Sequence, residues 1–112
     1  MDAGFDPGSW LGAVETLLSG AGAQGPLRSH GVDRNTVRLI ARIEAQHADS
    51  AGRSHLTHAQ VAELAGMSKA TVMHSRLVLT DAALLELVPL PSQPHGAQRI
   101  LHLPTAPARV GD

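Results

Sequence analysis

The sequence predicts a mainly α-helical domain that ends in a small β-hairpin. Three observations lead to this prediction. Two short amphipathic helices meet at Gly66, a longer helix with apolar residues at helical spacing precedes them, and two strand-like segments flank a turn-rich stretch at 91–97. The length of 112 residues suits one compact domain with flexible ends.

The N-terminal segment predicts a helix that begins at the start signal Asp6-Pro7-Gly8-Ser9 and runs to Gly20. Its apolar stripe is too strong for a free surface helix, so it either closes the core of its own chain or pairs with the same helix of a second chain. The stripe, which is also the candidate dimerisation element, consists of Trp10, Leu11, Val14, Leu17 and Leu18.

Composition divides the chain into three parts. Residues 20–26 are rich in Gly and Ala and predict a linker, so 1–27 is read as the N-terminal helix with its linker. Residues 28–104 form the main domain, and the Pro/Ala-rich residues 105–112 form a flexible tail.

The main domain is expected to begin with a helix capped by Asp33 and ending near Asp49. Its apolar side carries Val37, Leu39, Ile40 and Ile43, and the opposite side carries Arg34, Arg38 and Arg42. The arginines form either a solvated face or, through Arg34 or Arg38, phosphate anchors. Residues 50–55 are expected to be a loop.

The next segment predicts two helices joined by a tight turn. Thr57 and Gln60 have the spacing of a capping box, and Val61, Leu64 and Ala65 form an apolar stripe. Gly66 can adopt the left-handed conformation that ends a helix. Ser68 then caps a second helix that runs to about Leu79, with Val72 pointing inward. The spacing of small, glycine and apolar positions is typical of a helix-turn-helix.

Residues 84–90 and 99–103 predict the two strands of the hairpin, with 91–97 as its tip. Pro89 and Pro91 exclude a central strand and favour an edge position.

The run from Val61 to Val72, followed by Leu79, Ala83, Leu84 and Leu85, resembles winged helix-turn-helix domains of bacterial regulators and plasmid replication initiators. Ala83 departs from the glycine usual there, and Arg76 from a core leucine. The resemblance implies a three-helix core with a wing and here an extra N-terminal helix. It also implies duplex DNA as the partner, a role in transcription regulation or in plasmid or phage replication, and a homodimer.

The helical count places several side chains where they would meet DNA. Lys69 can reach a guanine edge or a phosphate, and Ser68 and Thr71 can bind phosphate at a helix N-terminus. Ala70 and Met73 can contact thymine methyl groups. The full set of candidate DNA contacts is Arg53, Thr57, Ser68, Lys69, Ala70, Thr71, Met73, His74, Arg76, His95 and Arg99.

Each of these assignments has a structural alternative. Thr71 can be a buried hydroxyl, and the stem of Arg76 can cover the core. The outward row of Ala70, Met73 and Leu77 is unusually apolar for a surface that reads a groove. It favours the alternative function, a winged-helix protein–protein interaction module without direct DNA readout.

Charge and aromatic content bear on the same choice. The net charge is -1, but residues 28–80 carry seven Lys and Arg against four Asp and Glu, a modest local excess of +3. The aromatic residues are Phe5 and Trp10, both before the main domain. Binders of single strands usually stack bases on aromatic side chains, so duplex DNA is favoured.

The sequence argues against several other classes. It contains no cysteine, no apolar run approaching the ~20 residues of a membrane span, and no N-terminal export signal, so we expect a cytoplasmic protein. Its seven histidines are scattered, which argues against a metal site. Phosphate-binding and nucleophile motifs are missing, so we expect neither an enzyme nor a cofactor or small-molecule substrate.

Overall fold

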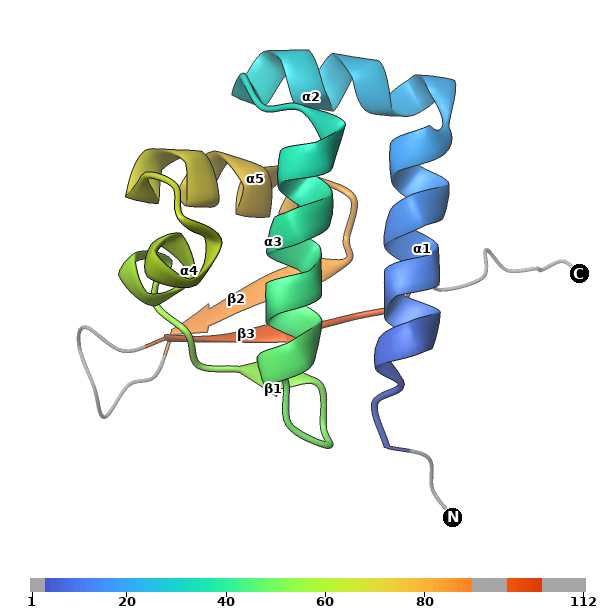
Figure 1. Ribbon diagram of the computed structural model, residues 1–112. Coiled ribbons are helices and arrows are strands. Elements are labelled where there is room, and N and C mark those ends of the chain that lie inside the picture. The colour runs from blue at the N-terminus through green and yellow to red at the C-terminus, as the bar shows by residue number, and fades with distance from the viewer. Residues whose placement is uncertain (1–3, 90–96, 104–112) are drawn as a thin grey trace, which may run out of the picture.

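The structure is a computed structural model that describes residues 4–89 and 97–103 (Figure 1). These residues form five α-helices, one short 3-10 turn and a three-stranded antiparallel sheet. In chain order the elements are α1 (Pro7–Ser19), η1 (Ala21–Ala23), α2 (Gln24–His30), α3 (Arg34–His47), β1 (Arg53–Ser54), α4 (His58–Ala65), α5 (Lys69–Asp81), β2 (Leu85–Pro89) and β3 (Ala97–Leu101). The expected helix-rich fold with a terminal hairpin is therefore present.

The first helix belongs to the core of its own chain. Asp6 caps it by accepting a hydrogen bond from the Gly8 N–H. Trp10, Val14 and Leu18 are buried where α1 packs along α3 (Figure 1). The indole N–H of Trp10 donates to the Leu84 carbonyl at 2.9 Å, which ties α1 to the start of β2.

The expected linker at 20–26 is wrong. After Gly20 the chain forms η1 and then α2, which lies across the N-terminal end of α3 and packs against α5 (Figure 1). Ala23 and Leu27 enter the same core as α1, and Gly31 ends α2 in the left-handed conformation. Burial of these apolar side chains stabilises a folded, helical conformation of the segment, although the segment is rich in glycine.

Two of the three arginines on α3 contact α1. Arg34 donates to the Leu18 carbonyl, and Arg38 forms an ion pair with Glu15. The Arg38 guanidinium lowers the pKa of that carboxyl below its usual value, since it stabilises the charged form. Arg34 and Arg38 therefore join α3 to α1, in place of the proposed phosphate anchors, and Arg42 is exposed beside them.

The corner between α4 and α5 forms as the sequence predicts. Thr57 accepts from the Gln60 backbone N–H while the Gln60 side chain accepts from the Thr57 N–H, which completes the capping box. Gly66 has φ 69°, and Ser68 caps α5. Leu64 is the exception in this segment, since it is 54% exposed.

The sheet has the strand order β1-β3-β2. β3 is the central strand. Its residue Arg99 lies opposite Leu87 of β2 on one side and opposite Ser54 of β1 on the other. Paired residues share a face, so Leu87, Arg99 and Ser54 lie on one face of the sheet. β1 lies within the expected loop 50–55, whereas β2 is an edge strand that ends at Pro89, as predicted. His95, the rest of the expected tip up to residue 96, and the expected tail lie outside the described residues, whereas Ala97 of the expected tip is the first residue of β3.

Two apolar clusters form the interior. The larger joins α1, α2, α3, α5 and the sheet, and the smaller joins α3, α4 and α5 around Ile40, Val61 and Val72. The larger cluster takes side chains from both sides of the expected division at residue 27. Within the described residues, no helix is long and apolar enough to cross a membrane.

Candidate nucleic-acid interface

The outer face of α5 is the surface that the sequence proposes for DNA. Lys69, Ala70, Met73 and Leu77 are exposed on it, with Met73 and Leu77 each 41% exposed. Hereafter these four residues are called the α5 outer face. Lys69 is the one exposed Lys or Arg on this helix. The face is therefore apolar along most of its length, with a cation at its beginning.

The N-terminal end of α5 has a local hydrogen-bond arrangement. The Ser68 Oγ accepts from the Thr71 N–H at 3.1 Å and contacts the Thr71 Oγ1 at 2.9 Å. The cap thus satisfies one of the backbone N–H groups that a helix leaves unpaired at its start. Both residues are at or near the surface, so the helix N-terminus is accessible beside Lys69.

Two further candidates lie on neighbouring elements. Thr57 is exposed, but its hydroxyl accepts from the Gln60 N–H as a helix cap. Arg53 is exposed on β1, 3.9 Å from Asp49, which is a weak surface ion pair. Arg53 is therefore the second accessible cation among the predicted contacts.

His74 does not project outward as expected. It is half-buried, and its Nδ1–H donates to the His30 carbonyl at 2.8 Å. The carbonyl can only accept, so the proton lies on Nδ1. His74 therefore joins α5 to α2.

Arg76 and Arg99 correct the prediction most clearly. The two residues are only 2% and 8% exposed. Arg76 forms an ion pair with the fully buried Glu44, and both arginines donate to the Leu56 carbonyl, at 3.1 and 3.2 Å. Glu44 also accepts from the Ser54 Oγ at 3.0 Å. The guanidinium groups therefore belong to a buried polar cluster rather than to an open surface.

This cluster also includes His58, which lies beside both guanidinium groups. The His58 Nδ1 is 3.0 Å from Arg76 Nη1, and its Nε2 is 3.4 Å from Arg99 Nη2. Burial and then the two neighbouring cations lower the pKa of His58 to about 4, so the ring is neutral at pH 7. We call Glu44, Ser54, His58, Arg76 and Arg99 the Glu44 cluster.

Glu44 and His58 were not among the functional residues predicted from the sequence. Glu44 lies seven residues after Val37 and four after Ile40, on the apolar side of α3. A carboxylate at that spacing signals a buried ion pair, since charged side chains are buried when they are paired. The partner could not be found from spacing alone, because Arg76 lies 32 residues away.

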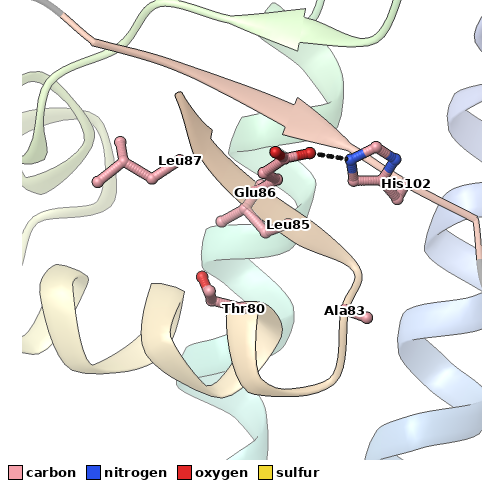
Figure 2. Close-up of a pocket in the computed structure, with 6 residues that line it drawn as sticks. All are labelled: Thr80, Ala83, Leu85, Glu86, Leu87 and His102. Atoms are coloured by element: carbon pink, nitrogen blue, oxygen red, sulfur yellow. Dashed lines mark hydrogen bonds and ion pairs between the residues drawn. The ribbon is translucent and has the colours of Figure 1, made fainter. Parts of the chain in front are cut away.

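Two hollows lie between α5 and the sheet. Figure 2 shows the first, of about 440 Å³, where Thr80 faces β2 and Glu86 forms a hydrogen bond with His102. The second, of about 280 Å³, shares Thr80 and Leu87 with the first. It is lined by His58, Met73, Arg76, Leu77, Thr80, Leu87 and Arg99, and is called the Arg99 hollow.

Comparison with protein families, with curated proteins and with solved structures finds no match for this chain. Among residues 4–89 and 97–103, no group of three or more His, Cys, Asp or Glu side chains is placed to hold a metal ion.

Proposed function

We propose that this chain is a winged helix-turn-helix protein that binds duplex DNA. The proposal is supported by the order of elements after residue 33, which is α3, β1, α4, α5, β2, β3, with β1 paired to β3. A helix of this diameter fits the major groove, and a hairpin beside it lies where a wing would approach the duplex. Such a protein would act in transcription or in plasmid or phage replication by occupying a site, without chemistry of its own.

The observation that carries the proposal is the exposed first turn of α5. Lys69 and Ala70 are open to solvent there, next to the Ser68 cap and the positive end of the helix dipole. In this proposal Lys69 binds a phosphate or a guanine edge, and Ser68 and Thr71 bind phosphate. Ala70 and Met73 contact thymine methyl groups, and Arg53 binds phosphate from β1.

Fluorescence anisotropy with a labelled random duplex, between 50 and 200 mM salt, tests the proposal. Each phosphate contact contributes about 0.9 to the slope of log affinity against log salt. Lys69→Ala should weaken binding and reduce that slope by about one contact. The matched control is Arg42→Ala, which removes an exposed cation from α3 on the side of α1.

Two results would contradict DNA binding through α5. One is affinity that does not change with salt, and the other is equal loss of affinity in Lys69→Ala and Arg42→Ala. If binding occurs, selection of bound duplexes from a random pool then identifies the site sequence.

The second candidate function is a protein–protein interaction module. It is favoured by the exposure of Met73 and Leu77 on α5 and of Leu87, 51% exposed, on β2. In this case the anisotropy experiment should detect no duplex binding at 50 mM salt, and Met73→Gln should leave that result unchanged.

The dimer also remains a proposal. Three residues of the apolar stripe are buried in the core of their own chain, namely Trp10, Val14 and Leu18. A second copy could therefore contact only the partly buried Leu11 and Leu17 of this stripe. Light scattering at tens of micromolar, with Leu17→Gln as the variant, tests this interface. A monomer at that concentration would contradict it.

A further inference from the structure

The Glu44 cluster contains more positive charge than negative charge. Glu44 supplies one carboxylate, whereas Arg76 and Arg99 supply two guanidinium groups, and the neutral His58 adds no charge. The cluster therefore carries a net charge of +1 inside the protein. Arg76 is matched by Glu44, which leaves Arg99 as the unmatched cation. Burial and then the neighbouring Arg76 lower the pKa of Arg99 to about 10, and the Glu44 carboxylate only partly opposes this shift.

The cluster also has more hydrogen-bond donors than acceptors. A neutral imidazole has one acceptor nitrogen and one N–H. His58 Nδ1 accepts from Arg76 at the shorter distance of 3.0 Å, so its Nε2–H faces the Arg99 Nη2, another donor, at 3.4 Å. Two donors therefore point toward each other, and an acceptor placed near both would relieve this arrangement.

These groups line the Arg99 hollow, and apart from Thr80 the rest of its lining is apolar. Met73 and Leu77 of α5 and Leu87 of β2 line it together with His58, Arg76 and Arg99. Leu87 is the register partner of Arg99 on the neighbouring strand, so an apolar side chain lies next to the unmatched guanidinium. A volume of about 280 Å³ is just below the range of about 300–1,000 Å³ for ligand sites, so the hollow suits a small molecule.

We propose that the Arg99 hollow binds a small carboxylic acid with an apolar body. The carboxylate would accept from Arg99 and from the Nε2–H of His58, and the apolar body would lie against Met73, Leu77 and Leu87. A planar guanidinium matches the geometry of a carboxylate, which favours this acid over other anions. Binding would bring the net charge of the cluster to zero and would bury part of the exposed apolar surface.

This site does not depend on DNA binding, so the two proposals can fail separately. The probe is sodium octanoate, titrated into the full chain at pH 7.5 by calorimetry, with backbone amide NMR shifts as the second readout. We expect saturable binding with shifts concentrated at residues 56–58, 73–80 and 87. The neutral analogue 1-octanol and the cationic analogue octylammonium should bind at least about tenfold more weakly, because they cannot accept from two donors while supplying a negative charge.

Variants separate the role of the cation from that of the apolar walls. Arg99→Gln should weaken octanoate binding at least tenfold. Because Arg99 is buried, Leu87→Gln provides a second variant that changes an exposed side chain, and it should weaken binding about threefold or more. Leu64→Gln is the matched control, since it replaces an exposed leucine on α4 that does not line the hollow, and it should bind as the original chain does.

Three results would overturn the proposal. The first is equal binding of octanoate and 1-octanol, and the second is equal effects of Leu87→Gln and Leu64→Gln. The third is an octanoate signal whose NMR shifts lie away from the hollow.

Discussion

Replacing Ala83 with glycine should stabilise this protein. Ala83 follows α5 and has φ 62°, which makes it the one non-glycine residue of the described chain in the left-handed region. Its N–H donates to the Thr80 carbonyl, and the Leu84 N–H donates to the Leu79 carbonyl, both at 3.0 Å. This pattern is the Schellman motif, in which glycine normally occupies the left-handed position.

The expected gain follows from two opposing terms. A side chain with a Cβ costs about 1–2 kcal/mol in the left-handed region. Glycine loses more backbone entropy on folding than alanine, which returns about 0.5–1 kcal/mol. Ala83 is exposed, so its methyl group contributes little burial. The net gain for Ala83→Gly should be about 0.5–1 kcal/mol in the free energy of unfolding, or about 2–4 °C in Tm.

Urea denaturation, followed by circular dichroism, measures this difference. The control is Ala82→Gly at the preceding residue, which has φ -88° and ψ 5°. That change adds the entropic cost without relieving any strain, so it should destabilise by about 0.5–1 kcal/mol. The reasoning is refuted if Ala83→Gly is neutral or destabilising, or if the two glycine variants behave alike.

Three further changes test the core and the Glu44 cluster. Glu44→Gln should cost about 3–5 kcal/mol by urea denaturation, because it leaves buried guanidinium charge without its carboxylate; a loss below about 1 kcal/mol would contradict this. Trp10→Phe should cost about 0.5–1.5 kcal/mol, since it removes one of the two hydrogen bonds that the Leu84 carbonyl accepts and leaves the one from the His102 N–H, and a variant as stable as the original chain would contradict this. Between pH 6.5 and about 4 the unfolded chain protonates His58 while the folded chain does not, so stability should fall as the pH falls through this window. His58→Gln should reduce that loss when unfolding is compared at pH 7.5 and 5.0, and an unchanged pH dependence would count against a half-buried neutral ring.

The local signals in the sequence were reliable where the side chain and the backbone it controls are close together. Each predicted cap or turn residue affects the backbone no more than three or four residues away, and each is found at its predicted position. These residues are Asp33, Thr57, Gly66 and Ser68. The expected glycine position at Ala83 also has the backbone conformation that a glycine would adopt.

The errors concern contacts between distant segments. Arg76 and Arg99 looked like surface cations because their acceptors, Glu44 for Arg76 and the Leu56 carbonyl for both, lie on other segments. The segment 20–26 looked like a linker because its composition is Gly-rich, yet Ala23 is buried against the core. Sequence periodicity identifies the apolar face of a single helix, but it does not show which other helix or strand packs against that face.

Trp10 also provides an optical reporter. It is the single tryptophan of a chain that contains no tyrosine, and its indole is fully buried with its N–H bonded to Leu84. Its emission therefore comes from one place, the seam between the first helix and the start of the hairpin. A red shift on mild perturbation would show that these two segments have separated, before any loss of helical signal.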